Sequence, residues 1–313
     1  ESEFPPTNKV FEVMKSFYRY ERYPDITAKE LKIKLSEYVA LPTQFIEVYN
    51  GSDDALKDII TVFVDKDTKV LSYQPSYTQV NTFITTNTDN YMKVNIKDPL
   101  GKHEYDFNYC RINDVVYLVN PNNPTGKLLE VDKIEELVKT YPDVLFIIDE
   151  AYYEFAKMSC CHLVVSHKNL IVTRTFSKAF GLASVRLGYC MGHPDTLSHL
   201  RKVRNGKAVN TLAQMCGIAA LDDLDYLDSR INEMNDAKKF FVDNLPYQYH
   251  AVDSKTNFVL LKTPDSEKLL NKMKDNKILI RDRSSFDNLE NCVRITIGSK
   301  KQIIRVLDVI NYA

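Results

Sequence analysis

The sequence predicts an α/β protein whose larger part is built on a mostly parallel sheet, followed by a smaller α+β part. Two observations support this fold class. Up to about residue 222, short apolar runs rich in β-branched residues alternate with amphipathic helical patterns. The last third carries a long polar helical pattern and then mixed strand and helix patterns. The 313 residues suffice for a large domain over residues 27–222 and a small domain over residues 223–313, joined by an N-terminal arm of residues 1–26.

Taken in order, the elements begin with a polar arm, which we expect to be extended because Pro24 disfavours helix at Tyr23. Thr27 and Glu30 have the spacing of a capping box and predict a helix start. Ser52 is expected to be the N-cap of the next helix. The other predicted strands are 45–49, 69–73, 115–119, 144–148, 169–172, 257–261, 278–281 and 293–297, and the other predicted helices are 131–141, 201–221, 224–244, 266–274 and one ending near residue 311.

The composition excludes several classes of function. Lysine and arginine number 41 against 42 acidic residues, so no net field attracts nucleic acid or an anionic membrane. No apolar run reaches 18 residues, and the first residues lack the basic and apolar regions of a signal peptide. The six cysteines and six histidines show no metal-ligand spacing. We therefore expect a cytoplasmic protein with reduced cysteines and no metal site.

Polar side chains follow the ends of several predicted strands. Tyr77, Asn123, Asp149 and Lys178 each come after the carboxyl end of such a strand. In open α/β sheets, ligands bind at this edge. A lysine held away from water loses affinity for its proton and becomes a usable amine nucleophile. The alternative is that Lys178 only opens a surface helix, since most lysines are exposed.

The other candidate residues also allow a purely structural interpretation. Ser52 and Asp53 are ordinary residues for a helix start, although the same free N–H groups can hold a phosphate. Asp149 could be a helix cap, Asn123 a turn residue, and Tyr77 and Tyr152 packed aromatics. Strand arginines such as Arg281 and Arg294 often form structural ion pairs. Residue types alone leave these alternatives open.

Three motifs in a fixed order narrow the choice. They are Asn-Pro-Asn-Asn-Pro-Thr-Gly at 120–126, Asp-Glu-Ala-Tyr at 149–152, and Ser177-Lys178 with Arg186 eight residues later. With this order and spacing, nearly the whole chain resembles the fold-type I pyridoxal-phosphate enzymes of the class I/II aminotransferases. The histidinol-phosphate aminotransferase branch is the most similar. The resemblance implies a mostly parallel seven-stranded sheet sandwiched by helices, plus a smaller C-terminal α+β domain.

The resemblance also implies roles around the cofactor, pyridoxal 5'-phosphate. Lys178 would hold it as an aldimine and move the proton between Cα and C4′. Asp149 would keep the pyridine nitrogen protonated, so that the ring withdraws electrons. Tyr152 and Asn123 would hydrogen-bond the 3′-oxygen of the ring, and Tyr77 would stack on it.

Phosphate binding is implied for a second group of residues. The backbone amides of Ser52 and Asp53, the hydroxyls of Thr175 and Ser177, and the planar guanidinium of Arg186 would hold the cofactor phosphate.

The resemblance further implies a second subunit and a substrate site. Tyr23 would reach the phosphate from the partner subunit of a homodimer. Arg294 would bind the substrate carboxylate, Arg281 would help to hold a second anion, and Asn257 would lie near the substrate.

The chain departs from the family pattern at three places. Ser-Glu-Phe-Pro at 2–5 stands for the usual Asn-Glu-Asn-Pro, residues 204–210 replace a linker with proline and tyrosine, and Asn276-Lys277 replaces a glycine. We expect all three places to lie where the substrate side chain is recognised, which puts histidinol phosphate itself in doubt.

The expected activity is transfer of an amino group between L-glutamate and a small, phosphorylated oxo compound. Decarboxylation of an amino-acid phosphate on the same fold is the open alternative, because the sequence does not show which bond to Cα lies perpendicular to the cofactor ring. A binding protein without catalytic activity is a third reading. It would have no need of Lys178, Asp149, Tyr152, Asn123 and Arg186 together.

Overall fold

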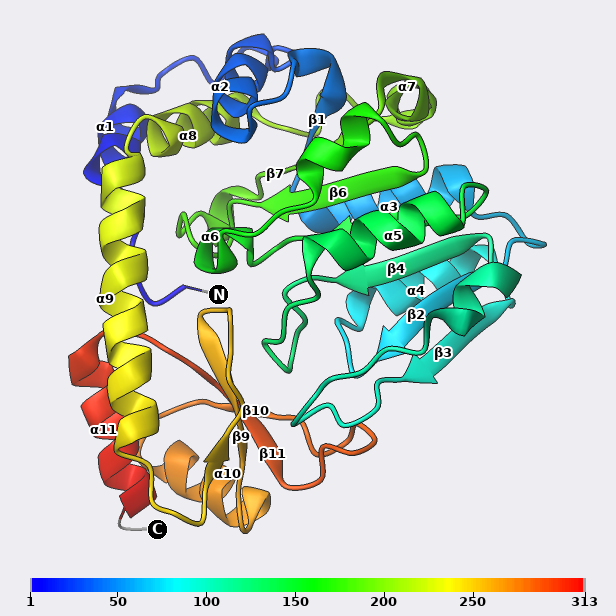
Figure 1. The fold of residues 1–313 in the computed structure, drawn as a ribbon. Coiled ribbons are helices and arrows are strands. Elements are labelled where there is room, and N and C mark those ends of the chain that lie inside the picture. Colours follow the sequence, from blue (N-terminus) through cyan, green and yellow to red (C-terminus); the bar gives the residue numbers. More distant parts are fainter. Residues whose placement is uncertain (1, 312–313) are drawn as a thin grey trace.

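A computed structural model describes residues 2–311 and contains a seven-stranded sheet between helices and a separate four-stranded sheet (Figure 1). The strands of the large sheet lie in the order β1 (Ile46–Tyr49), β7 (Gly188–Gly192), β6 (Leu170–Thr175), β5 (Leu145–Asp149), β4 (Val115–Val119), β2 (Val70–Gln74) and β3 (Tyr91–Asn95). Only β7 is antiparallel to its neighbours, β1 and β6. The other pairs are parallel, which confirms the predicted fold class.

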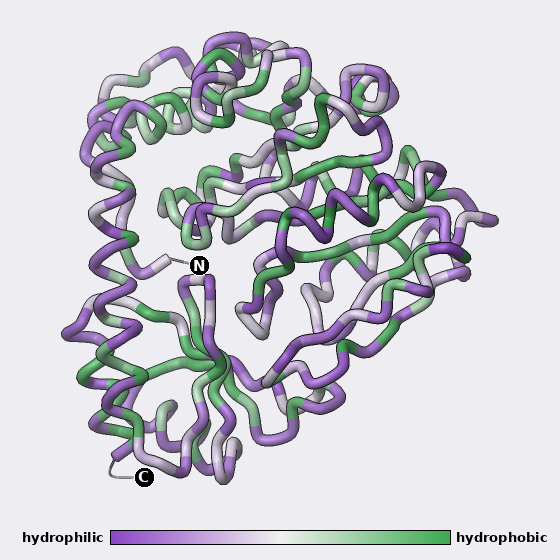
Figure 2. Tube along the Cα trace, viewed as in Figure 1, coloured by the Kyte–Doolittle hydropathy of each residue, from purple (hydrophilic) through white to green (hydrophobic). Residues whose placement is uncertain are grey.

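Helices cover both faces of the large sheet, and this explains its continuous apolar strands. Alternate residues of one strand belong to different cores: Val116 and Leu118 of β4 pack in one cluster, and Val115 and Tyr117 in the other. The first core includes α2 (Lys29–Val39), α5 (Val131–Thr140) and α8 (Thr211–Leu221), and the second α3 (Ser52–Phe63), α4 (Gln79–Asn87) and α7 (Pro194–Val203). In Figure 2, hydrophobic residues predominate along the strands of the large sheet, whereas the helices around it alternate between hydrophobic and hydrophilic residues.

The four-stranded sheet is antiparallel throughout, in the order β10 (Arg281–Asp282), β11 (Cys292–Thr296), β9 (Phe258–Lys262) and β8 (His250–Ala251). Its core includes residues of α9 (Leu224–Asp243), α10 (Ser266–Asp275) and α11 (Lys300–Asn311). The long α9 runs from the level of α8 down to this sheet (Figure 1). The domain boundary at residues 222/223 falls just before α9 and stays a prediction.

Several local expectations were wrong. The arm contains a helix, α1 (Asn8–Ser16), which packs against α8 and buries Val10. The single helix expected at 201–221 is two helices, α7 and α8, and the Asn210 side chain caps α8 by accepting from the Ala213 N–H at 2.8 Å. The strands β3 and β7 were not predicted from the sequence.

Two helix starts also differ from the expectation. The carboxylate of Asp25, rather than the Thr27 side chain, holds the start of α2: it accepts from the Lys29 N–H at 2.8 Å and from the N–H of the preceding Thr27 at 2.9 Å. Gly51, rather than Ser52, is the N-cap of α3. A short helix α6 (Tyr153–Ala156) and four 3-10 turns, η1 (Thr43–Phe45), η2 (Phe107–Ile112), η3 (Cys161–Val165) and η4 (Ala183–Val185), complete the described elements.

Within residues 2–311, no helix combines the length and apolar character needed to cross a bilayer.

Candidate active site

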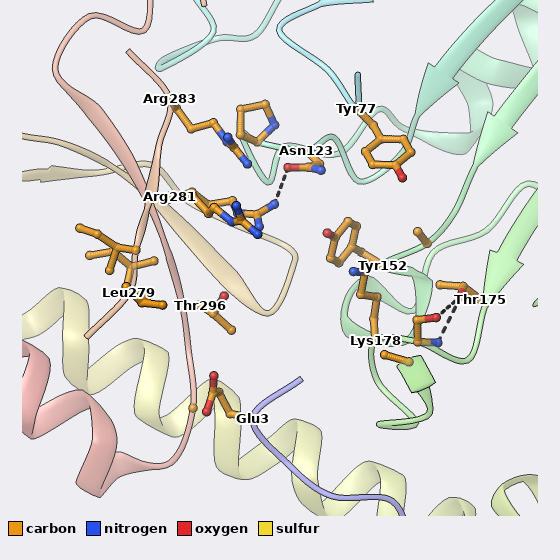
Figure 3. Close-up of a pocket in the computed structure, with 18 of the residues that line it drawn as sticks. Glu3, Tyr77, Asn123, Tyr152, Thr175, Lys178, Leu279, Arg281, Arg283 and Thr296 are labelled. Carbon is orange, nitrogen blue, oxygen red and sulfur yellow. Dashed lines mark hydrogen bonds between the residues drawn. The ribbon is translucent and has the colours of Figure 1, made fainter. Parts of the chain in front are cut away.

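A cavity of about 1030 Å³ lies between the carboxyl ends of the large sheet's strands and the four-stranded sheet (Figure 3). Twelve of the fourteen predicted site residues line it. From the large sheet's side come Ser52, Asp53, Tyr77, Asn123, Asp149, Tyr152, Thr175, Ser177, Lys178 and Arg186, and from the other side Arg281 and Arg294. The four residues of the strand-end argument, Tyr77, Asn123, Asp149 and Lys178, thus line one cavity.

Lys178 follows β6 in a tight loop that is anchored on both sides. Phe176 is fully buried and packs against Phe180, with ring centroids 4.7 Å apart. The Leu182 N–H closes the loop on the Phe176 carbonyl at 3.0 Å. The Lys178 Nζ lies 5.9 Å from the centre of the Tyr152 ring and points into the cavity (Figure 3). Lys178 thus lines the cavity instead of opening a surface helix.

Asp149, the last residue of β5, presents a buried carboxylate. It accepts hydrogen bonds from the Tyr117 hydroxyl at 3.0 Å, the Thr173 hydroxyl at 3.2 Å and the Ala151 N–H at 3.2 Å. Burial raises the pKa of Asp149 to about 6, although these donors oppose the shift. A cation beside this carboxylate would stabilise its charged form.

The start of α3 forms a cradle of hydrogen-bond donors. No side chain caps this helix, so its first N–H groups have no side-chain acceptor. Ser52 and Asp53, at this helix start, line the cavity. Gly51 has φ 91°, and a Cβ there would lie 2.7 Å from the Arg186 Nη2. Only glycine therefore lets the guanidinium approach the helix start. Such a site suits an anion with several oxygens, such as phosphate.

Two hydroxyls complete the cradle. Thr175 Oγ1 donates to Ser177 Oγ at 3.0 Å, and Ser177 Oγ accepts from Arg186 Nη1 at 3.4 Å. The Tyr77 hydroxyl donates to the Asp53 carboxylate at 2.9 Å. Burial, followed by the charge of Asp53, raises the pKa of Tyr77. Asp53 Oδ2 also lies 3.6 Å from Arg186 Nη2, so its side chain orients the guanidinium.

The opposite wall of the cavity is rich in arginine. Arg294 of β11 donates from Nη1 to Asn123 Oδ1 at 2.7 Å, and its guanidinium lies 4.7 Å from the centre of the Phe258 ring. Arg281 of β10 pairs directly opposite Arg294 in the strand register. Arg283 also lines the cavity. Sequence reasoning missed it, although residues two apart in a strand share one face.

Two predicted residues lie elsewhere. Asn257 lines a small hollow with Glu3 and Phe4 rather than the main cavity, because it precedes β9 and its carbonyl accepts from the Ile297 N–H at 2.8 Å. Tyr23 is 79% exposed on the arm, with the Lys207 Nζ 4.3 Å from its ring centre. The predicted role of Tyr23 requires a second subunit and stays a prediction.

The three departures from the family pattern have different locations. Glu3 and Lys277 line the cavity, as expected. Residues 204–210 do not line it, so that expectation was wrong for a single chain. The Arg204 guanidinium turns inward and donates to the carbonyls of Val48 at 3.0 Å and Ile26 at 2.7 Å. This segment is held against the large domain.

Sequence reasoning also missed Tyr117. It lies in the middle of β4, where the apolar pattern hides its polar end, and its hydroxyl is the shortest of the three contacts to Asp149. The hydroxyl of a buried tyrosine usually has a hydrogen-bond partner, so a tyrosine within an apolar strand could have indicated a buried polar contact. In the described part of the chain, no group of three His, Cys, Asp or Glu side chains is placed to hold a metal ion.

Comparison with known proteins gives concordant matches. The family model described as aminotransferase class I and II matches residues 3–310. The chain is 38% identical to the dihydroxyacetone phosphate transaminase of Campylobacter jejuni, over 98% of this chain and 87% of that protein. It is 30% identical to the histidinol-phosphate aminotransferase of Geotalea daltonii, over 98% and 89%.

A solved structure agrees in fold. The histidinol-phosphate aminotransferase from Sinorhizobium meliloti, in complex with pyridoxal-5'-phosphate, superposes with a TM-score of 0.89. The match covers 100% of this chain and 89% of the other at 24% sequence identity, so it is a similarity of fold.

Proposed function

The chain belongs to the class I and II aminotransferases, and from this membership we propose that it transfers an amino group between L-glutamate and a small phosphorylated oxo compound. It is a pyridoxal 5'-phosphate-dependent enzyme, like the similar protein solved with that cofactor. The observation that carries the proposal is the two-sided cavity. A lysine, a buried acid and a phosphate cradle face a wall of arginines.

The residues present fit this cofactor. The buried carboxylate of Asp149 suits the protonated pyridine nitrogen, since a cation there offsets the cost of burying the acid. The first amides of α3, the Ser177 hydroxyl and the Arg186 guanidinium suit the phosphate. When bound, the cofactor supplies an aldehyde that takes up amino groups and a ring that withdraws electrons from Cα.

The protein's own groups would do the following. The Lys178 amine would accept the proton from the substrate Cα and release it at the C4′ carbon of the cofactor, and would move it in the opposite direction when the oxo acceptor is aminated. Asn123 uses Oδ1 to hold Arg294, which leaves its Nδ2 to donate toward the ring oxygen. The Tyr152 ring lies 5.9 Å from the lysine nitrogen and lines the same cavity. Asn123 thereby links the cofactor wall to the substrate wall.

The arginine wall supports an anionic substrate. Arg294 is placed for the carboxylate of glutamate, and Arg281 beside it for a second negative group. The Campylobacter and Geotalea relatives are both named for phosphorylated compounds, which supports a phosphorylated acceptor here. Glu3 and Lys277 line the same cavity, so they bear on which acceptor is chosen.

A homodimer forms part of the proposal. Tyr18, Tyr20 and Tyr23 are each more than 70% exposed on the arm. Large aromatic side chains so exposed favour a partner surface. In such a dimer the Tyr23 hydroxyl would donate to the cofactor phosphate in the partner's cradle.

The test is one half-reaction. L-Glutamate is added in excess to the purified enzyme loaded with cofactor, without an acceptor. We expect the visible absorbance of the bound cofactor to disappear and one 2-oxoglutarate to form per active site. An unchanged spectrum with no 2-oxoglutarate would refute glutamate as the donor. Release of carbon dioxide from an amino-acid phosphate would then establish the decarboxylase alternative.

A further inference from the structure

Three arginines share one face of the four-stranded sheet. Arg281 and Arg294 are directly paired across β10 and β11, so their side chains leave the sheet on the same side. Arg283 is two residues beyond Arg281, and its N–H donates to the Cys292 carbonyl at 2.9 Å, which continues the ladder. Strand alternation therefore places Arg283 on that same face. All three line the cavity.

This cluster has no acidic counterpart on its own face. Asp282, between two of the arginines, faces the other way, and its carboxylate accepts from the Ser284 N–H at 2.8 Å. Among residues 2–311, no carboxylate forms an ion pair with Arg281, Arg283 or Arg294. Burial, followed by the charges of Arg294 and Arg281, lowers the pKa of Arg283 to about 10. Arg283 still remains a cation at neutral pH, and a bound anion would relieve the repulsion.

The three guanidinium groups are not equally available. Arg294 uses Nη1 to donate to Asn123 and lies over the Phe258 ring, so it is held in place for the glutamate carboxylate. Arg283 donates from Nη1 to the carbonyl of Asp282 at 2.9 Å, which leaves Nε and Nη2 for a ligand. Figure 3 shows Arg281 and Arg283 both extending into the cavity toward Asn123. Arg281 and Arg283 can thus bind one anion together.

The chemistry of the two substrates, taken from the proposed function on which this step rests, assigns that anion. Glutamate carries its two charges on separate carboxylates, and one guanidinium fork satisfies each carboxylate. A phosphate monoester concentrates its charge on three terminal oxygens, which accept from two forks at once. We propose that Arg283 is a specificity-determining residue that, with Arg281, binds the phosphate group of the amino acceptor and is not needed for glutamate.

The test compares two unreactive probes on the holoenzyme by isothermal titration calorimetry. Glycerol 3-phosphate represents the phosphate monoester, and glutarate the dicarboxylate. We expect Arg283→Gln to weaken glycerol 3-phosphate binding about tenfold to a hundredfold, as for loss of a charged hydrogen-bonding partner. Glutarate binding and the glutamate half-reaction should stay within about twofold. Arg283→Lys keeps the positive charge but not the two-pronged guanidinium, so its affinity for glycerol 3-phosphate should lie between those of the wild type and Arg283→Gln.

Matched controls make the result decisive. Arg111→Gln removes an exposed arginine of η2 that does not line the cavity, and it should bind both probes like the wild type. Equal losses for both probes, no loss for glycerol 3-phosphate, or no binding of glycerol 3-phosphate by the wild type would each overturn the proposal. Failure of the glutamate half-reaction in the wild type would instead refute the proposed function, because neither probe reacts.

Discussion

At the scale of single residues, the environment of each group determines its chemistry. Asp149 is buried and its pKa is raised to about 6, whereas Lys178 lies at the cavity beside the Tyr152 ring. Asp149 suits a cationic partner, and Lys178 presents its amine to the cavity. These two residues carry the sharpest tests of the proposed activity.

Lys178→Ala should lower turnover by at least about 10³-fold, because its amine is the group that would move the proton at Cα. The visible absorbance of the cofactor attached to the protein should be lost as well. Steady-state turnover and the mass of the borohydride-reduced protein measure both effects. Lys168→Ala, which removes an exposed lysine paired with Asp195, is the control. Persistence of activity and of the attached cofactor in Lys178→Ala would refute the assignment.

Asp149→Asn should change how the stability of the cofactor-free protein depends on pH. The folded state holds the Asp149 proton more tightly than the unfolded chain, whose carboxyl has the ordinary pKa of 3.8. The wild-type free energy of unfolding therefore falls as pH rises from about 4 to 6. Asparagine does not titrate, so the free energy of unfolding of the variant does not fall in this way. Relative to the wild type it should gain on the order of 2 to 3 kcal/mol between about pH 4 and pH 7.

Denaturant titration of both proteins without cofactor, at several pH values, measures this difference. A difference between them that stays constant with pH would contradict the raised pKa of Asp149. With cofactor supplied, the same variant should lose turnover, since the pyridine nitrogen then lacks its carboxylate partner.

At the scale of elements, the start of α3 and the loop before β7 form one unit. Gly51 has a positive φ, and Gly188 of β7 lies so close that a Cβ there would be 2.4 Å from the Ser52 nitrogen. Close backbone packing at these two glycines therefore positions the phosphate cradle. Adding one methyl group at Gly51 tests this packing.

Gly51→Ala should weaken cofactor binding by about tenfold or more and cost on the order of 1 to 2 kcal/mol of stability. The added Cβ would be strained at φ 91° and would displace the Arg186 guanidinium. Cofactor titration followed by absorbance, together with thermal unfolding, measures both. Thr61→Ala, at an exposed position farther along α3, is the control. Unchanged cofactor affinity in Gly51→Ala would show that the cradle lies elsewhere.

At the scale of the whole molecule, two segments connect the large-sheet part of the chain with the four-stranded sheet. α9 contributes Leu227 and Ile231 to a core of the large sheet and Met234 to the core of the four-stranded sheet, and the N-terminal end lies between the two parts (Figure 1). The Phe4 carbonyl lies against Gly181 in the lysine loop, while the Glu3 carboxylate accepts from Gln302 of α11 at 2.9 Å. The exposed arm around Tyr23 points to a further connection, to a second chain.

Mixing two defective chains tests the proposed homodimer. Tyr23→Phe should weaken cofactor retention about tenfold, because a hydrogen bond to a charged phosphate is lost. Combined with Lys178→Ala under conditions that exchange subunits, it should regain activity. One site of the mixed dimer then has its own Lys178 and the partner chain's intact Tyr23. No regain, or a monomer near 36.1 kDa in light scattering, would refute the shared site.

Much of the fold followed from local pattern. Apolar runs located β4 and β5 to within a residue, because strands buried on both faces must be apolar throughout. The β7 strand, Gly-Tyr-Cys-Met-Gly, has a glycine at each end and gave no such signal. It forms because β1 and β6 supply its hydrogen bonds from distant parts of the chain.

By itself, the sequence determined the class of fold, the cofactor through the family resemblance of its motifs, and the strand-end residues that line the cavity, since motif order and periodicity are local properties. Only the tertiary structure decided that Tyr117 bonds Asp149, that Asn257 lies outside the cavity, and that Arg283 joins the substrate wall. These depend on strand order and register, which bring residues far apart in the chain within contact distance. The physical reason is that the packing of all elements together determines which side chains come into contact.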